Sequence, residues 1–209
     1  MNDTKVETRT EEQNLNEISL VRREKLEKLR QEGKDPFDIT RYDVTHKARQ
    51  IIDDFDNMEG QKVSIAGRII TRRIMGKASF AHILDSSGQI QIFVQINEVG
   101  DEQYQSFRSY DIGDIIGLTG VVFRTRMGEI TVKVQEMVLL AKSLHPLPEK
   151  WHGLKDPDLR YRHRYTDLIV NPDVRRTFEI RSKIIRGIRN YLDERGYLEV
   201  ETPILHTTA

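Results

Sequence analysis

Residues 62–96 read KVSIAGRIITRRIMGKASFAHILDSSGQIQIFVQI, and this stretch decides the fold. Apolar residues recur at every second position over most of it, which is the period of a half-buried β-strand. Ser86-Ser87-Gly88 is a turn signal between two such runs. The stretch therefore predicts three consecutive strands, and the first of them is unusually rich in arginine.

The alternation resumes further along the chain. Residues 101–110 are compatible with a helix, Ile115 to Phe123 predict a fourth strand, and Met127-Gly128 closes a hairpin into a fifth strand. Three strands, a helix and two strands is the order of an OB-fold, a five-stranded Greek-key barrel that binds oligonucleotides on one strand face. Other small barrels share this count, so the order alone favours an OB-fold without settling it.

Helical periodicity precedes the barrel. Residues 1–13 are polar and expected to fray. A helix ended by Gly33 is then predicted from the apolar residues Leu15, Ile18, Val21, Leu26 and Leu29. A second, shorter helix is expected from Thr45, as its N-cap, to about Gly60.

The sequence after the barrel predicts a second domain. Residues 143–170 contain three of the six prolines and indicate an irregular connector. A helix from Pro172 to Gly196 follows, and Tyr197 to Val200 predict a strand. The apolar stripe of that helix consists of Phe178, Ile184, Ile185, Ile188 and Leu192.

Four regions are expected from this reading. They are a helical extension over residues 1–59, the OB-fold domain over 60–143, a linker over 144–171 and the start of an α+β domain over 172–209. The chain ends directly after a strand that has no partner in the sequence before it. We therefore expect a fragment of a longer protein.

Composition excludes several classes of function. The chain has 33 basic and 33 acidic residues, but residues 159–195 alone carry 10 basic and 5 acidic ones. The absence of cysteine excludes disulfides and thiolate zinc sites, and the six histidines have no metal-binding spacing, so no metal site is expected. No secretory signal is visible, and no apolar run approaches the roughly 18 residues of a membrane span. A cytoplasmic protein is expected.

Side chains of the strands suggest a ligand. Strand parity places Phe80 and His82 on one face with Gln91, away from the core-facing Ala81 and Ile83. Unpaired bases stack on aromatic rings for about 1–3 kcal/mol each, and an amide can read the edge of a base. Nearby cations would neutralise phosphates, and the first strand and its turn supply Arg68, Arg72, Arg73 and Lys77. The face therefore predicts binding of single-stranded nucleic acid.

Each of these residues also has an ordinary structural interpretation. Phe80 taken alone is an isolated surface aromatic, the four cations are a solvated strand face, and His82 is a hydrogen-bonded surface histidine. Glu129 is a carboxylate at the end of a hairpin, whereas in a binding site it would favour a base edge that donates hydrogen bonds. The convergence of cationic, aromatic and amide groups on adjacent strands favours the binding site.

Three segments together resemble the N-terminal part of bacterial class II lysyl-tRNA synthetases. They are GRIITRRIMGKASFAHILDSSGQIQIFV at 67–94, PLPEKWHGLKDPDLRYRHRYTDL at 146–168 and RGYLEVETPIL at 195–205. The middle segment is typical of lysine-specific members and not of their aspartate and asparagine relatives. The resemblance extends from about Asn14 to the end of the chain.

The resemblance implies an anticodon-binding barrel followed by a class II catalytic domain. It implies that Phe80 stacks on the central anticodon uridine, that Gln91 and Arg73 read the edge of this base, and that Glu129 faces a neighbouring anticodon base. Strict alternation aligns Arg72, not Arg73, with Arg68. A bend or β-bulge between Gly67 and Gly76 would reconcile the two readings.

The same resemblance concerns the C-terminal segment. The helix from Pro172 and the residues up to Pro203 resemble class II motif 1, which implies a dimer interface that includes Phe178, Ile185 and Pro203. Packing within the domain is the alternative interpretation of the stripe. The family's motifs 2 and 3, which bind ATP, lysine and Mg²⁺, would lie beyond residue 209, so no catalytic residue and no bound cofactor is expected in this chain.

These observations predict the anticodon-binding part of a lysine–tRNA ligase, inactive by itself. The complete enzyme would use ATP and Mg²⁺ to attach lysine to its tRNA through lysyl-adenylate. The expected partners are the anticodon loop of lysine tRNA and a second copy of the enzyme, and neither DNA nor a membrane. The alternative is a free-standing OB-fold module that binds RNA without base preference, or that dimerises, with no role in aminoacylation.

Overall fold

The structure is a computed structural model that describes residues 3–148, 154 and 156–203, with side chains from residue 15 onward. The chain divides into two compact units, Met1–Pro146 and Leu147–Ala209. Residues 149–153 and 155 of the lysine-specific segment lie outside the described residues, as do residues 204–209 at the end of the motif 1 segment. Each unit is described by itself below.

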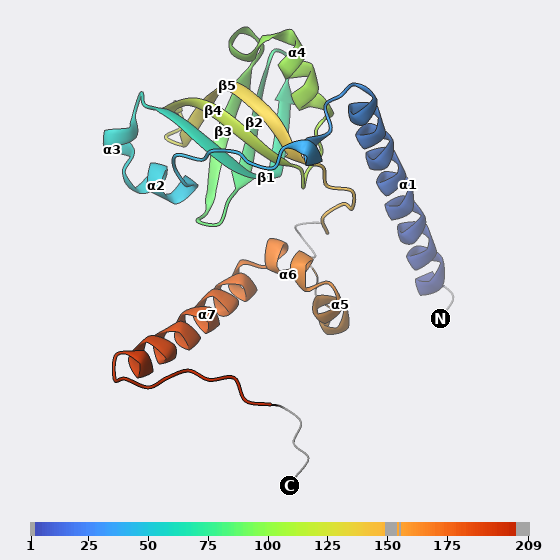
Figure 1. The fold of residues 1–209 in the computed structure, drawn as a ribbon. Coiled ribbons are helices and arrows are strands. Elements are labelled where there is room, and N and C mark those ends of the chain that lie inside the picture. Colours follow the sequence, from blue (N-terminus) through green and yellow to red (C-terminus); the bar gives the residue numbers. More distant parts are fainter. Residues whose placement is uncertain (1–2, 149–153, 155, 204–209) are drawn as a thin grey trace. The chain divides into compact units, whose positions relative to one another are not determined.

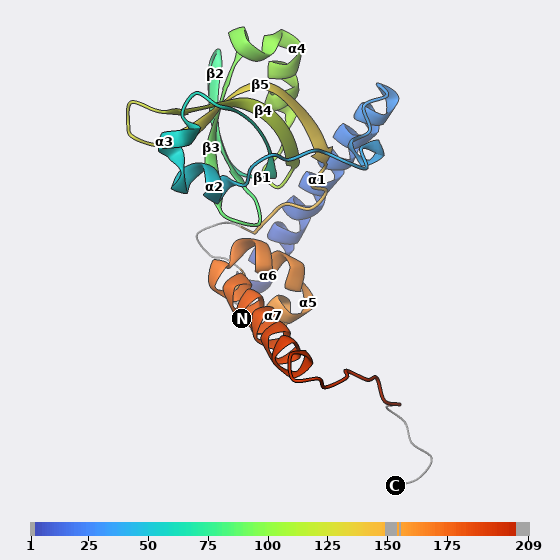
Figure 2. The ribbon, with the colours of Figure 1, turned by 60° about the vertical axis from the view of Figure 1, so that its left-hand side comes forward.

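A closed five-stranded barrel forms the centre of the first unit (Figures 1 and 2). The order around the barrel is β1-β2-β3-β5-β4, with β3 and β5 parallel and the other pairs antiparallel. Its strands are β1 Lys62–Met75, β2 Ala78–Leu84, β3 Gln89–Gln95, β4 Ile115–Arg124 and β5 Ile130–Ala141. The helix α4, Ile96–Ser109, lies between β3 and β4, so the predicted OB-fold is confirmed.

Alternating apolar residues fill the barrel. Residues at every second position of β2 and β3 are fully buried, among them Ile83 and Ile92, which are at most 1% exposed. Tyr104 and Phe107 of α4 join the same core. Full burial of such side chains contributes about 1.5–3 kcal/mol each, which makes this core the main source of the barrel's stability.

One irregularity of β1 matters for the outer face. Ile69 pairs with Ile83, but Thr71 pairs with His82, so Ile70 is an extra residue that no partner opposes. This β-bulge lies between Gly67 and Gly76, where a bend or bulge would reconcile the two sequence readings, and it reverses the parity of the strand beyond it. Arg73 therefore pairs with Phe80, and Arg72 pairs with the core-facing Ala81.

Helix α1, Asp3–Gln31, is held against the barrel at its C-terminal half. Arg22 is buried and donates hydrogen bonds of 3.1 Å to the carbonyls of Ile112, Ser143 and His145. Gly33 follows the helix with φ of 68°, as its predicted role in ending the helix requires. The expected fraying of residues 1–13 is wrong for residues 3–13, which are helical.

Short helical segments connect α1 to the barrel: η1 Pro36–Asp38, α2 Ala48–Asp53 and α3 Phe55–Met58. The prediction that Thr45 caps α2 is wrong, because the cap is Lys47. Thr45 is instead hydrogen-bonded to the backbone of Ser64. The N–H of Thr45 donates to the carbonyl of Ser64, and Oγ1 of Thr45 accepts from the N–H of Ser64, both at 2.9 Å. The hydroxyl of Thr45 is therefore engaged by the backbone of β1 and does not accept a hydrogen bond from the first turn of α2.

The described residues of the second unit form three helices, α5 Pro157–Arg162, α6 Arg164–Val170 and α7 Pro172–Asp193. The prediction of an irregular connector at residues 143–170 is therefore wrong for the part that forms α5 and α6. Asp156 caps α5, and the fully buried Asp167 accepts hydrogen bonds from Arg160, Arg164 and Asn171. Tyr197 to Val200 have no regular secondary structure, since a strand requires a neighbour to pair with. None of the helices in the described ranges is both long and apolar enough to cross a membrane.

Candidate nucleic-acid interface

The outer face of β1, β2, β3 and β5 brings the predicted residues into two adjacent rows. Strand pairing fixes both rows, because directly paired residues point to the same side of a sheet. The first row is Arg73, Phe80, Phe93 and Lys133, and the second row is Thr71, His82, Gln91 and Thr131. Phe80 and Gln91 therefore lie diagonally next to each other on neighbouring strands.

The aromatic rings of this face form a continuous group. The rings of Phe80 and Phe93 have centroids 4.7 Å apart and are inclined by 35°, and Phe93 contacts Phe123 edge-on at 6.2 Å. All three side chains are only partly buried. Phe93 thus supports Phe80 from one side and limits its rotation. A ring held in this way is a fixed platform on which an unpaired base can stack.

A chain of hydrogen bonds runs across the second row. The carboxylate of Glu129 accepts from Nε2 of His82 at 2.8 Å and from Nε2 of Gln91 at 2.6 Å. Thr71 Oγ1 lies 2.8 Å from Nδ1 of His82, and the hydroxyl of Thr131 donates to Oε1 of Gln91 at 2.8 Å. The structure therefore brings three of the candidate site residues, His82, Gln91 and Glu129, into direct contact.

The four predicted cations have different surroundings. Arg73 is exposed in the first row, and Lys77 is exposed in the turn between β1 and β2. Arg72 instead donates to the carbonyls of Phe107 and Arg108, at 2.9 and 3.0 Å, and to the carbonyl of Tyr110. The guanidinium of Arg72 therefore caps the C-terminal end of α4 and is not part of the face.

Arg68 is also withdrawn from the face. Its guanidinium donates to the carbonyl of Gly113 at 2.6 Å. Burial lowers the pKa of Arg68 and of Arg72, and the negative charge of Asp114 opposes this effect in both. The prediction that all four cations share one surface is therefore corrected, and Arg73 and Lys77 are the two that the structure exposes.

Some residues of the face were not among the predicted site residues. Alternation placed Phe93 and Thr131 outward, with the parity of Gln91 and Glu129, but neither was counted as a candidate binding residue. Phe123 is the last apolar residue before a hairpin, where sequence patterns do not distinguish a core residue from a surface one. Thr71 was hidden by the bulge, which changes its side of the sheet.

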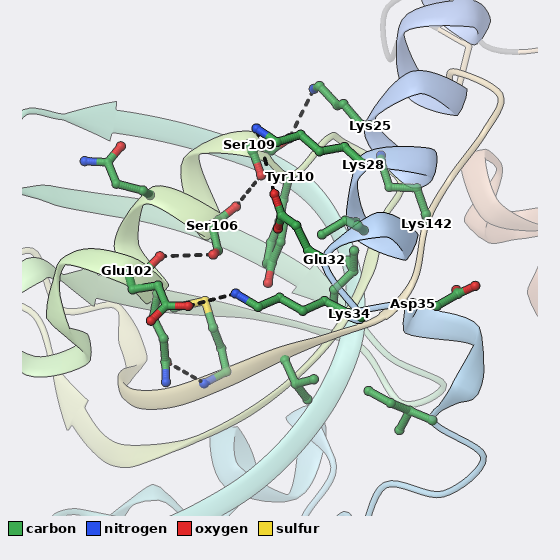
Figure 3. Close-up of a pocket in the computed structure, with 18 of the residues that line it drawn as sticks. Lys25, Lys28, Glu32, Lys34, Asp35, Glu102, Ser106, Ser109, Tyr110 and Lys142 are labelled. Carbon is green, nitrogen blue, oxygen red and sulfur yellow. Dashed lines mark hydrogen bonds and ion pairs between the residues drawn. The ribbon is translucent and has the colours of Figure 1, made fainter.

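A hollow of about 730 Å³ lies on another side of the first unit, between α1, η1, α4 and β5 (Figure 3). Its lysines are paired with carboxylates: Lys34 with Glu102 at 2.8 Å and Lys142 with Asp111 at 2.7 Å. Burial, with the nearby charge of Asp114, raises the pKa of Tyr110 in its wall to about 12, which keeps the phenol neutral. The hollow thus offers an anion little uncompensated charge, in contrast to the outer face of the barrel.

The predicted dimer-interface residues lie in the second unit. Phe178 and Ile185 are seven positions apart on α7, so they share one side of the helix, and they are 39% and 41% exposed. A hollow of about 380 Å³ beside Ile185 is also lined by Leu192 and Leu198. Pro203 is exposed in the segment after α7.

Comparison with protein families agrees with both units. Residues 63–140 match the family described as "OB-fold nucleic acid binding domain", and residues 156–209 match "tRNA synthetases class II (D, K and N)". The two matches together place the chain among the class II aminoacyl-tRNA synthetases that carry an OB-fold domain.

Individual relatives are lysine–tRNA ligases. The chain is 59% identical over 200 residues to a lysine–tRNA ligase of Pelotomaculum thermopropionicum, covering 96% of this chain and 39% of that protein. It is 57% identical over 195 residues to one of Thermoanaerobacter sp., covering 93% and 39%, and 51% identical over 199 residues to one of Clostridium tetani, covering 95% and 40%. The chain belongs to the lysyl-tRNA synthetase family and spans about two-fifths of the length of these relatives, so the resemblance found in the sequence is confirmed.

Proposed function

We propose that the outer face of the barrel binds the anticodon loop of lysine tRNA and selects a central uridine. The observation that carries this proposal is the fixed ring of Phe80 beside the amide of Gln91, on adjacent strands of a nucleic-acid-binding fold. Stacking on Phe80 would hold the base, and Gln91 would contact its edge. Arg73, which pairs with Phe80, would contact the edge of the base or the adjoining phosphate.

This binding would serve a larger activity. In a complete lysine–tRNA ligase the lysine carboxylate would attack the α-phosphate of ATP and displace pyrophosphate, and a hydroxyl of the terminal ribose of the tRNA would then take lysine from the adenylate and release AMP. We assign to this chain the selection of the tRNA, and we assign ATP, Mg²⁺ and the chemical steps to the rest of such an enzyme. A homodimer formed through α7 and action in the cytoplasm, where tRNA is used, belong to the same proposal.

The first prediction tests the stacking platform. Phe80→Ala should weaken binding of an anticodon stem-loop with a central uridine by about 5- to 150-fold, since a stacked base contributes about 1–3 kcal/mol. Fluorescence titration at fixed salt would measure this affinity. Phe37→Ala is the matched control, because Phe37 is 49% exposed in η1, outside the outer face, and its loss should leave the affinity unchanged.

Two results would contradict the proposal. One is undiminished binding by Phe80→Ala. The other is equal affinity of the wild-type chain for stem-loops with unrelated anticodons, which would favour a free-standing RNA-binding module without base preference.

A further inference from the structure

The amide of Gln91 is held at both ends by residues of this chain. Its Nε2 lies 2.6 Å from Oε2 of Glu129, and its Oε1 lies 2.8 Å from the hydroxyl of Thr131. Thr131 is fully buried, so its hydroxyl is not available to a ligand. If Gln91 contacts the central anticodon base, as the proposed function states, the orientation of this amide decides which base edge it can bind.

Glu129 permits only one orientation of the amide. An ionised carboxylate accepts hydrogen bonds and cannot donate them. If the amide of Gln91 were reversed, its carbonyl oxygen would face the carboxylate at hydrogen-bond distance and the two would repel each other. The hydroxyl of Thr131 does not discriminate in this way, because a hydroxyl both donates and accepts. Glu129 is therefore the residue that fixes the direction.

Glu129 is itself fixed in place. Its other oxygen, Oε1, lies 2.8 Å from Nε2 of His82, which must donate because the carboxylate only accepts. Nδ1 of His82 is 2.8 Å from the hydroxyl of Thr71 on the adjacent strand β1. Both carboxylate oxygens thus have a donor, and the carboxylate cannot turn away from Gln91 without breaking the bond to His82.

We infer that Glu129 is a positioning residue that locks the donor and acceptor of Gln91 and thereby selects uracil over cytosine. The locked amide presents one carbonyl lone pair and one N–H to the ligand. Uracil offers the complement, because its N3–H donates and its adjacent carbonyl accepts. Cytosine has an acceptor at N3 beside a donor amino group, so it requires the reversed amide that Glu129 forbids.

The test compares two stem-loops that differ only in a central uridine or cytidine, titrated against the full 209-residue chain. Glu129→Gln keeps the size of the side chain, but its amide can face Gln91 with either its oxygen or its nitrogen. The preference for uridine over cytidine should fall about fivefold or more in this variant, which corresponds to the lower end of one base-edge contact. Glu98→Gln is the matched control, because Glu98 lies near the same face but pairs with Lys133.

The outcomes separate this inference from the proposed function. A reduced uridine preference in Glu129→Gln, with the preference kept in Glu98→Gln, supports the lock. If Glu129→Gln weakens both complexes by the same factor, Glu129 acts on a neighbouring base or on folding, and the lock is overturned while the proposed function stands. If the wild-type chain does not distinguish the two stem-loops, the proposed function fails and the lock fails with it.

Discussion

Arg72 and Arg73 are neighbours in β1, and the bulge at Ile70 gives them opposite surroundings. Arg73 points outward beside Phe80, with its charge exposed to solvent. Arg72 pairs with a core-facing residue and donates to carbonyls at the C-terminal end of α4, where regular helical hydrogen bonding stops. One extra residue in a strand therefore separates a structural arginine from a candidate binding arginine.

This contrast gives the third prediction. Arg72→Gln should lower the free energy of unfolding by about 1–3 kcal/mol, because hydrogen bonds from a charged donor to helix carbonyls are lost. Arg73→Gln should change the free energy of unfolding by no more than about 0.5 kcal/mol and should weaken RNA binding. The dependence of the RNA affinity on salt concentration should fall by the amount expected for the loss of about one phosphate contact. Urea unfolding and titrations at several salt concentrations measure the two effects. Equal effects of both variants on RNA affinity would contradict this division of roles.

The sequence predicted residues whose environment follows from strand parity alone. Phe80, His82 and Gln91 were placed on one face because alternation continues without interruption through β2 and β3. The contact between Gln91 and Glu129 was not predictable, because it depends on β3 pairing in parallel with β5, which is distant in sequence. Such pairings are set by closure of the barrel and not by any local pattern.

At the scale of elements, α2 is attached to the β2–β3 turn by one carboxylate. Asp85 accepts hydrogen bonds from the backbone N–H of Ala48 at 2.7 Å and from Ser87 and Gly88 of the turn. Burial favours the neutral form, but these hydrogen bonds outweigh it and hold the pKa of Asp85 below its usual value. One charged side chain thus fixes the tight turn and the start of a helix together.

The fourth prediction follows from this lowered pKa. A carboxylate with a lower pKa in the folded state stabilises the protein above its unfolded pKa of about 4, and that contribution is lost as the pH falls through the folded pKa. Asp85→Asn should therefore be less stable than the wild type near neutral pH, and the difference should shrink below about pH 4. Urea unfolding of both proteins across this range measures it, and a constant difference would exclude the linkage.

Helices and strands were predicted best where a single sequence pattern was present and no long-range contact competed with it. The five strands followed from alternation, whereas the start of α2 was misplaced because Thr45 found a partner in β1. The two short helices α5 and α6 were missed because each is at most seven residues long, too short for a helical period to be visible. The buried Asp167 links α5 and α6 through its hydrogen bonds, but no pattern in the sequence distinguishes it from an exposed aspartate.

At the scale of the whole chain, the two units differ in how completely they bury apolar surface. The barrel unit closes on itself, and its core residues reach 0% exposure. In the second unit Ile184, Ile188 and Tyr191 of α7 are 57%, 57% and 55% exposed. Burial of this exposed apolar surface against another protein surface would stabilise the amphipathic helix in water.

The fifth prediction concerns what covers α7. If a second copy does so, as the proposed dimer requires, the 209-residue chain should self-associate at micromolar concentration, and Ile185→Asp should shift it to monomer because the charge would be buried in the interface. Lys183→Asp introduces the same side chain two positions earlier, on a different side of the helix, and should leave association intact. Sedimentation velocity over a concentration series distinguishes these cases. A wild-type chain that remains monomeric throughout the series would leave α7 to a partner other than a second copy, and Phe178 and Ile185 would then have no part in a dimer of this chain.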